Sequence, residues 1–344
     1  MEQLMKTIKR SIVAALGIAL LTPLTNSYAQ DVTTLNFQTH HSSSSLQGEA
    51  LIRFADLANE MSGGSLDIKM HTDSAVVKAS EAFESASMGI IDGDATGAGY
   101  ITVKSSLQFY GDIMGGYNTP HELIGWYKDG GGLELANELY HKFDMHLVGV
   151  FVATPEALSS TTELAGIEDI DGWKFRSPPG MESEIFASLG AGPVVMPFGE
   201  VFTAMSTGTV SGADASTLAV NKGLGLYDIA EHATYPGFHS MPIEHVAMNL
   251  EKWNSLSEAE QQILRSALDT IALEIVQDST MLDRQAAVEL RQEGVTLHDW
   301  SEEDRQVFRE AAQAVWEDWS TRSPEAKAAY DSHIAYMTKI GILE

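Results

Sequence analysis

The 344-residue sequence contains no cysteine, which excludes several kinds of site at once. Disulfide crosslinks, thiolate nucleophiles, iron–sulfur clusters and cysteine-ligated zinc all require a thiol. A long chain without disulfides must be stabilised by a large apolar core, and a hydrophobic content of 44% with 20% charged residues is typical of a globular protein. The length is enough for two domains of ordinary size.

Basic residues are also scarce, with 21 Lys and Arg against 48 Asp and Glu and a formal net charge of −27. Such a surface repels phosphate backbones and anionic headgroups, so we expect no nucleic-acid partner and no membrane-surface binding. It also repels anionic ligands at long range, so an anion site would need a local pocket of positive charge. Acidity that only keeps an exported protein soluble is the alternative.

No segment is apolar for the roughly 20 residues that a membrane span requires. The apolar run Ile12–Leu21 follows three basic residues and precedes the small-x-small sequence Ser27–Ala29. Together these features are typical of a secretory signal peptide, which we expect at residues 1–29. A short buried helix is the alternative. The signal predicts a mature protein in the periplasm of a Gram-negative bacterium.

Short strand-like and helical segments alternate from Leu35 onward, which predicts an α/β protein with mostly parallel sheets covered on both faces. Ligands bind at the carboxyl ends of the strands of such sheets, and a cleft between two domains is the natural site. We expect four regions in the chain. These are a signal peptide at 1–29, a discontinuous domain I at 30–153 and 241–256, domain II at 154–240, and C-terminal helices at 257–344 packing across both lobes.

Local patterns predict three elements near the domain boundary and in the C-terminal region. Met241–Asn249 is expected to be a strand that returns to the first domain. Ser257 with Glu260 is expected to form a capping box, and Ser301 with Asp304 to cap a further helix.

The usual signatures of catalysis are missing from the sequence. There is no Gly-x-Ser-x-Gly elbow, phosphate loop, dinucleotide-binding glycine fingerprint or His-Glu-x-x-His motif. Adjacent histidines on a strand point to opposite faces, so His40 and His41 are expected to be a poor chelate. For this pair and for His239 with His245, a solvent-facing or satisfied structural role is expected in place of a metal site. We therefore expect a protein that is not an enzyme, with a periplasmic enzyme acting on an organic acid as the alternative.

Four blocks in the central third resemble, in order and spacing, the extracytoplasmic solute receptors of TRAP transporters, the DctP-type family. Two further segments, Leu226-Tyr227 and Tyr235–His239, match the branch that binds 2-oxo acids and related hydroxy acids. The resemblance implies a two-lobed periplasmic binding protein fold with an interdomain cleft and a C-terminal helical tail. The four blocks are D-I-D-G-W-K-F-R-S-P-P-G at 169–180, L-G-A at 189–191, M-P-F-G-E-V-F-T-A-M at 196–205 and G-T-V-S-G-A-D at 208–214.

The resemblance implies that Arg176 grips the carboxylate of the ligand. Its planar guanidinium can hold a carboxylate through two parallel charge-assisted bonds, which lysine cannot reproduce. A structural salt bridge across the hinge is the alternative role. Tyr100 follows a glycine-rich turn and is expected to present its hydroxyl to the cleft, or else to pack on a domain face.

Other site residues follow from the resemblance. Glu156 falls near a glutamine that contacts substrate and cation in the 2-oxo-acid branch, and Asp214 matches the acidic residue of the last block. Ala215 replaces a residue that is usually tryptophan or asparagine, and Ser240 replaces a glutamate of the cation-using branch. These departures leave a bound cation open and its identity unknown.

The same departures predict a roomier, more polar pocket. In such a pocket Ser216, His239 and Ser240 would bond ligand hydroxyls, as in a longer hydroxy acid or a sugar acid. The resemblance also implies small and large TRAP membrane subunits as partners, although the ligand-binding subunit of a sensor would look the same. The amphipathic segment Ile263–Val276 either packs on its own domains or pairs two copies, so both a monomer and a homodimer remain open.

Overall fold

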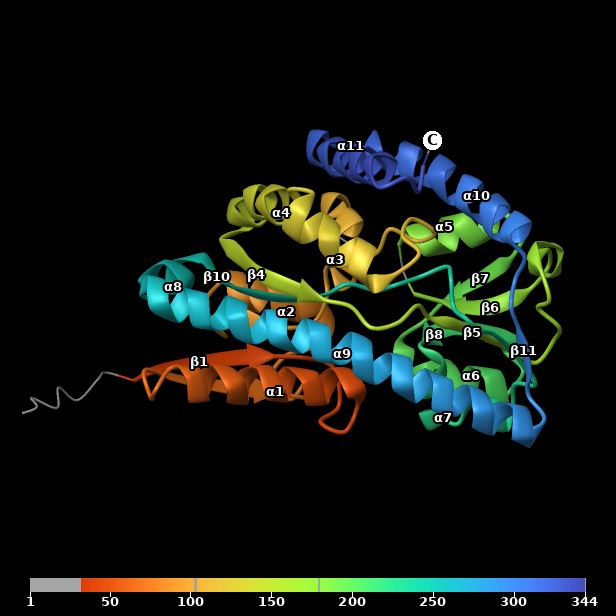
Figure 1. The fold of residues 1–344 in the computed structure, drawn as a ribbon, viewed down its shortest axis with the longest axis horizontal. Helices are drawn as coiled ribbons and strands as arrows, with labels where there is room; N and C mark the ends of the chain where they lie inside the picture. Colours follow the sequence, from red (N-terminus) through yellow and green to blue (C-terminus); the bar gives the residue numbers. More distant parts are fainter. Residues whose placement is uncertain (1–31, 102–103, 179, 344) are drawn as a thin grey trace, which may run out of the picture. The chain divides into compact units, whose positions relative to one another are not determined.

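The computed structural model describes residues 32–101, 104–178 and 180–343, and Figure 1 shows the fold of this part of the chain. The expected signal peptide at residues 1–29 lies outside the described residues. None of the helices within the described ranges combines the length and the apolar character that a membrane crossing requires.

The first sheet has the strand order β2-β1-β3-β10-β4. β1 pairs in parallel with β2 and β3, whereas β10 lies antiparallel between β3 and β4. The chain returns to this sheet after building the second one, which confirms the strand expected near residues 241–249. The strands are β1 (Thr33–Gln38), β2 (Leu66–His71), β3 (Gly93–Asp94), β4 (Met145–Phe151) and β10 (Glu244–Asn249).

The second sheet has the order β11-β9-β5-β8-β6-β7. β6 is parallel to β7 and β8, but β5 is antiparallel to β8 and β9, so both sheets are mixed and the expectation of mostly parallel sheets was too simple. The strands are β5 (Ala157–Ser160), β6 (Lys174–Ser177), β7 (Gly192–Val195), β8 (Gly212–Ser216), β9 (His232–Thr234) and β11 (Thr296–His298).

β11 adds a strand to the region 257–344, where the sequence analysis expected helices. It pairs in parallel with β9 and so extends the second sheet by one short strand. The strand follows directly after a helix that ends at Gly294, whose left-handed backbone is a common helix stop. Three residues are too few to show an alternating pattern, which is why the sequence did not reveal the strand.

Helices cover both sheets, and several begin with the caps that the sequence supplies. Ser45 caps α1, and Thr119 with Glu122 forms a capping box ahead of α3, with Pro120 in its first turn. The helices before the C-terminal region are α1 (Leu46–Met61), α2 (Ala79–Ser87), α3 (Pro120–Asp129), α4 (Gly132–Tyr140), α5 (Met181–Ser188), α6 (Val201–Ser206), α7 (Leu218–Gly223) and α8 (Leu250–Ser255).

The long helix α9 (Glu258–Glu293) packs against both sheets. Its first half, with Leu264 and Leu268, shares a core with Leu35 of β1, so the apolar face of 263–276 packs on its own chain. Its last third, with Leu290, packs with Ala233 of β9. The expected capping box of Ser257 and Glu260 is present at its start.

Asp283 on α9 binds the segment that leads from the first sheet to the second, and so holds that segment against the helix. Its Oδ2 accepts a hydrogen bond from Thr154 Oγ1 at 2.5 Å, and its Oδ1 accepts one from the amide of Ala219 at 2.8 Å. The amide of Thr154 also donates to Ser279 Oγ at 3.1 Å. This contact fixes the point where the chain crosses into the second sheet.

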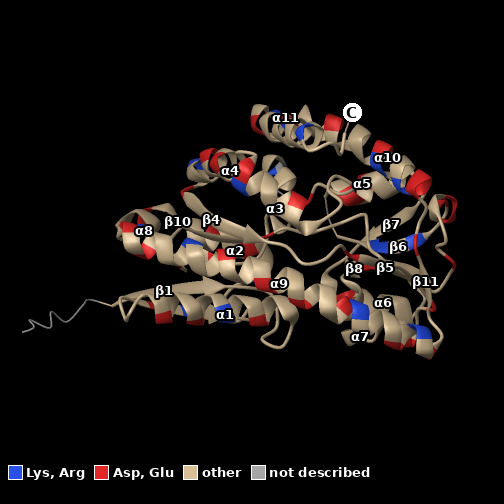
Figure 2. Ribbon diagram, viewed as in Figure 1, with Lys and Arg blue, Asp and Glu red and all other residues tan. Residues whose placement is uncertain are grey.

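Two further helices, α10 (Glu302–Ser320) and α11 (Pro324–Lys339), complete the C-terminal region. Ser301 caps α10 as expected, and Glu302 and Glu303 lie in its first turn, where negative charge is favourable. Acidic residues are spread over the outer helices, whereas basic residues are sparse and one of the few basic segments is β6 (Figure 2).

Candidate ligand-binding site

Arg176 is held in a fixed orientation near the end of β6. The side chain is buried, with only 5% of the residue exposed. Its Nε donates to the main-chain oxygen of Met196 at 3.2 Å and its Nη1 to that of Asp214 at 2.6 Å, while the guanidinium carbon lies 6.0 Å from the ring centre of Phe198. Met196 directly follows β7 and Asp214 lies within β8, so β6 and its two neighbouring strands position one guanidinium.

The guanidinium of Arg176 has no acidic partner among the residues that the structure describes. Neither an ion pair with a carboxylate nor any hydrogen bond from Nη2 occurs there. A structural salt bridge, the alternative role for Arg176, would need a carboxylate partner, and the described ranges contain none in contact with the guanidinium. A buried cation without a counter-ion is costly, so this group is suited to an anion that comes from outside.

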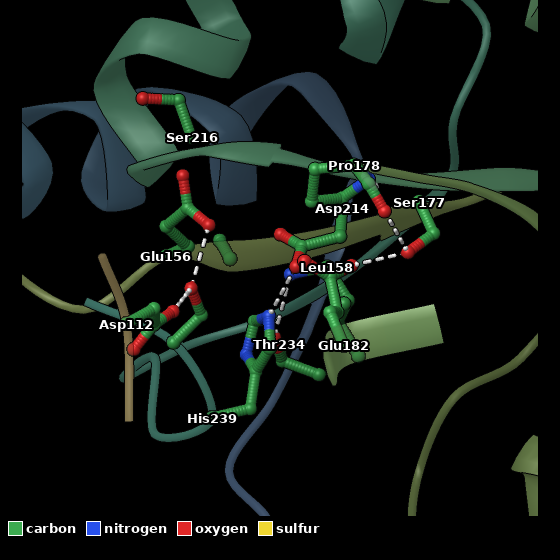
Figure 3. A network of polar contacts seen from close by, with 12 residues as sticks. Asp112, Glu156, Leu158, Ser177, Pro178, Glu182, Asp214, Ser216, Thr234 and His239 are labelled. Carbon is green, nitrogen blue, oxygen red and sulfur yellow. Dashed lines mark hydrogen bonds and ion pairs between the residues drawn. The ribbon is translucent and has the colours of Figure 1, made fainter. Parts of the chain in front are cut away.

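Asp214 and His239 form a second, fully buried feature of the site (Figure 3). Asp214 Oδ2 lies 3.2 Å from His239 Nε2, although the two groups are not aligned for a hydrogen bond. Burial by itself would raise the pKa of Asp214, but the His239 imidazole and the neighbouring Glu182 and Glu156 carboxyls lower it to about 2. Asp214 is therefore the ionised carboxylate of the site.

Three other carboxyl groups around Asp214 favour the neutral form. Burial raises the pKa of Glu156 and Glu182 well above the usual range, and the charge of Asp214 raises both further. Burial likewise raises the pKa of Asp112 to about 7. Protonated carboxyls donate hydrogen bonds, so the site combines one anionic carboxylate with several neutral donors.

The hydroxyl of Ser240 shows how closely these carboxyls are coupled. Its Oγ lies 2.6 Å from Asp112 Oδ2 and 2.9 Å from Glu156 Oε2. A hydroxyl carries one proton, so it can donate to only one of the two oxygens. The other carboxyl must be protonated and donate to Ser240, which agrees with the raised pKa values of Asp112 and Glu156.

Replacing Asp112 with asparagine is expected to reduce the pH dependence of stability. The folded chain keeps a proton on Asp112 up to about pH 7, whereas the group in the unfolded chain loses it near its ordinary pKa of 3.8. The contribution of this group to the free energy of unfolding is therefore full below about pH 4 and is lost as the pH rises toward 7. Asparagine stays neutral and can still donate to Ser240.

The measurement for Asp112→Asn is the thermal unfolding midpoint as a function of pH, with Asp56→Asn as the control because Asp56 is exposed on α1. The midpoint of Asp112→Asn should fall less than that of the wild type between about pH 4 and about pH 7. An unchanged slope for Asp112→Asn would show that Asp112 is ionised in the folded chain.

The structure brings most of the sequence-predicted residues together. Glu156 and Ser240 are bonded through side chains and also through the Glu156 amide and the Ser240 carbonyl at 2.9 Å. Arg176 bonds the main chain of Asp214, and His239 neighbours the Asp214 carboxylate. These five residues form one buried network.

Ser216 and Tyr100 lie beside this network. Ser216 is buried at the end of β8, two residues after Asp214, and Figure 3 shows it on the Glu156 side. The Tyr100 hydroxyl lies 3.0 Å from His40 Nε2. Burial raises the pKa of Tyr100, Glu244 adds to the rise and Arg176 opposes it.

Sequence reasoning missed Asp112 and Glu182. Glu182 is the second residue of α5, just after the Pro-Pro-Gly turn, and its Oε1 accepts a bond from Ser177 Oγ at 3.0 Å. An acidic residue in a first helical turn is usually a solvated capping group, so nothing in the local pattern marked it. Asp112 lies in an irregular segment that follows the 3-10 helix Ser105–Tyr110 and gave no signal.

The residues at this network fit a divalent cation. Glu156, Asp214 and His239 offer three ligand atoms within 4.8 Å of one another. Both Asp214 oxygens and both His239 nitrogens are buried, and the His239 nitrogens make no aligned hydrogen bond with a described residue. Calcium takes six to eight oxygen ligands, so two protein carboxylates would leave positions for water or ligand oxygens.

Two surface pockets lie elsewhere on the protein. Neither is lined by any of the residues predicted to bind the ligand. The first is lined by Tyr110, Leu135, Glu138, Leu139, Lys142, Pro324, Glu325 and Ala328, and the second by Gly115, Asn118, Gly237, Phe238, Glu302, Arg305, Phe308 and Arg309.

Two sheets, a helix that packs on both, and a buried guanidinium facing polar groups are the features of a solute-binding protein. Residues 37–322 match the family described as bacterial extracellular solute-binding protein, family 7, or DctP. The chain belongs to this family. The resemblance carried by the four central sequence blocks is thereby confirmed, and the family's members are periplasmic solute-binding proteins.

Individual relatives agree with this assignment. The chain is 32% identical to a TRAP periplasmic solute-binding protein from Rhodobacter sphaeroides, solved in an apo open form, with a TM-score of 0.78 over 90% of this chain and 99% of that one. It is 24% identical to a monocarboxylate 2-oxoacid-binding periplasmic protein from Nostoc sp., over 82% of this chain and 78% of that protein.

A third relative carries a cation. A TRAP periplasmic solute-binding protein from Colwellia psychrerythraea, solved with bound calcium and pyruvate, has a TM-score of 0.78 at 21% identity, over 90% of this chain and 95% of that one. This similarity shows a shared fold. The expected fold class, α/β with a helical C-terminal region, is confirmed by these structures.

Proposed function

We propose that this chain is the periplasmic substrate-binding subunit of a TRAP-type secondary transporter. It captures a small organic carboxylate, a 2-oxo, hydroxy or sugar acid, through Arg176 and delivers it to the small and large membrane subunits. The observation that carries the proposal is the buried guanidinium of Arg176, which has no acidic partner among the described residues. A ligand carboxylate would supply the missing negative charge.

The neighbouring residues would complete the recognition of the ligand. Glu156 is neutral, so its carboxyl group can donate a hydrogen bond to a keto, hydroxyl or carboxylate oxygen. Asp214 and His239 together offer a carboxylate acceptor and an imidazole. The hydroxyls of Tyr100, Ser216 and Ser240 supply further partners for ligand hydroxyls. This mixture favours a polar acid over a fatty acid.

Access to Arg176 requires the protein to open. Glu156, Arg176, Asp214 and His239 are all buried, so no solute reaches them while these residues are packed together. We propose that the lobes formed by 30–153 with 241–256 and by 154–240 separate by a hinge motion and close on the ligand. The apo open form of the Rhodobacter sphaeroides relative supports this proposal.

A cation would strengthen carboxylate binding at this site. The Colwellia psychrerythraea relative contains calcium together with pyruvate, and Glu156, Asp214 and His239 provide a set of donors that fits such an ion. A divalent cation held there would neutralise Asp214 and attract an acidic ligand. Glu156 in its neutral form is a weak ligand, so binding of the ion would favour loss of its proton.

A ligand screen tests the proposed function. The chain without residues 1–29 is mixed with 2-oxo acids, hydroxy acids, sugar acids and short dicarboxylates, and thermal unfolding is followed. An acid at 100 times its Kd should stabilise the folded chain by about 2.7 kcal/mol. The control is the amide of the best ligand, which has the same shape without the charge. Equal stabilisation by acid and amide would contradict a carboxylate clamp.

The screen also separates the competing functions. We expect the recovered ligand to be chemically unchanged by NMR after prolonged incubation, with one ligand per chain. Conversion of the acid to a product would favour a periplasmic enzyme. Capture of the two membrane subunits by the ligand-loaded chain in detergent supports transport, whereas capture of a sensor kinase supports sensing.

A further inference from the structure

A second group of metal-ligating side chains has no residue in common with the Arg176 network. His40 and His41 follow the end of β1, and Glu244 begins β10. The two imidazole rings have centroids 3.9 Å apart and are inclined by 38°, and His41 Nε2 lies 3.0 Å from Glu244 Oε1. One ligand atom from each of the three residues lies within 4.8 Å of the others.

This arrangement overturns the expectation that adjacent histidines form a poor chelate. That expectation assumed an extended strand, in which successive side chains point to opposite faces. β1 ends at Gln38, and the chain bends at His40 and His41. The bend turns both imidazoles toward Glu244, so two nitrogen donors and one carboxylate meet at one place.

Two polar atoms of this group are buried without partners. His40 Nδ1 and Glu244 Oε2 are inaccessible and make no hydrogen bond among the described residues, whereas His41 Nε2 is paired with Glu244 Oε1. Leaving one such atom unsatisfied costs about 1–3 kcal/mol. Two of them beside a third donor, the His41 imidazole, indicate a ligand that bonds all three residues.

The surroundings also suit a metal ligand set. His40 Nε2 lies 3.0 Å from the Tyr100 hydroxyl, and a metal-bound histidine usually donates its second N–H to such an oxygen. Donation from Nε2 leaves the Nδ1 lone pair free for an ion. Gly97 has no side chain beside Glu244, where an added Cβ would lie 3.4 Å from Glu244 Oε2.

We propose that His40, His41 and Glu244 form a binding site for a divalent transition-metal ion of the zinc class. Two imidazoles and a carboxylate are a ligand set that zinc uses when it keeps an open coordination position. Zinc bonds of about 2.0–2.2 Å place tetrahedral donors roughly 3.3 Å apart. Donors within 4.8 Å reach that spacing by small side-chain rotations.

The chemistry of the donors separates this site from the cation site at Glu156, Asp214 and His239. That cluster has two carboxylates and one imidazole, whereas this one has two imidazoles and one carboxylate. Calcium selects oxygen donors and imidazole suits zinc, cobalt, nickel and copper. The two sites are therefore expected to select different ions.

The test uses the chain without residues 1–29, freed of metal with a chelator. Zn²⁺ alone is titrated by calorimetry, and Co²⁺ is followed through its visible absorption, which reports nitrogen ligation and a low coordination number. The wild type should bind Zn²⁺, and His40→Ala, His41→Ala and Glu244→Gln should each weaken binding by about tenfold or more. His121→Ala, which removes an exposed imidazole from α3, is the control.

Glu244→Gln also guards against loss of the fold, because the amide keeps the shape of the carboxylate while removing its charge. The proposal is overturned if the wild type does not bind Zn²⁺. It is also overturned if the His40→Ala, His41→Ala and Glu244→Gln variants fold and bind Zn²⁺ as tightly as the wild type. The result is independent of the ligand screen, because Zn²⁺ binding is measured without an organic acid.

Discussion

Arg176→Ala is expected to weaken binding of the organic acid by at least about a hundredfold. Removing one partner of a buried, hydrogen-bonded charge pair costs about 2–5 kcal/mol, and each 1.4 kcal/mol is a factor of ten in Kd. Arg176 is buried, so no other basic side chain can replace it from solvent. Calorimetric titration with the acid found in the ligand screen measures the effect.

The stability of Arg176→Ala without ligand separates a binding role from a structural one. The variant loses two hydrogen bonds, to the main-chain oxygens of Met196 and Asp214, but it also removes a buried cation that has no counter-ion in the described part of the chain. These two effects oppose each other. The loss of unfolding free energy should therefore be smaller than the loss of binding free energy.

Two companion variants sharpen the result. Arg176→Lys keeps the charge, but one ammonium cannot bond Met196, Asp214 and a ligand as the planar guanidinium does, so most of the affinity should still be lost. Lys174→Ala removes an exposed charge from the same strand and should leave the affinity almost unchanged. Near-native affinity in Arg176→Ala would disprove the clamp.

The sequence predicted those features whose cause lies within a few neighbouring residues. The capping boxes and helix starts followed from short patterns, such as Ser257 with Glu260, and the structure has both groups in place. Met241–Asn249 was expected to be a strand that returns to the first domain, and the structure has β10 at Glu244–Asn249. The family was predicted from four ordered blocks, because spacing over dozens of residues is more specific than any one motif.

The unpredicted features depend on burial or on a local bend. Asp112 and Glu182 look like ordinary acidic residues, and their raised pKa values arise only from the tertiary fold. The meeting of His40 and His41 depends on the bend after β1 ends at Gln38. If the strand continued through both residues, their side chains would point to opposite faces. The sequence alone shows neither which acidic residues are buried nor where the chain bends.

Gly237→Ala is expected to unfold at a temperature lower by about 5 °C or more, the largest effect expected from adding one methyl group near the site. A Cβ at this position would lie 2.1 Å from the carbonyl oxygen of Glu156 and 2.6 Å from that of Pro155. Both contacts are with main chain, which cannot turn away as a side chain would. Overpacking of this kind costs about 3 kcal/mol.

The same substitution should also weaken ligand binding, because the added methyl group would displace the segment that carries Glu156. The Glu156 amide bonds the Ser240 carbonyl at 2.9 Å, so a shift of either segment moves both residues. The matched control is Gly199→Ala, where nothing lies within 4 Å of an added Cβ and the unfolding free energy should change by less than about 0.5 kcal/mol. If the two variants unfold at the same temperature, then Gly237 is not required for the close approach of these segments, and the packing that positions Glu156 tolerates more space than the structure shows.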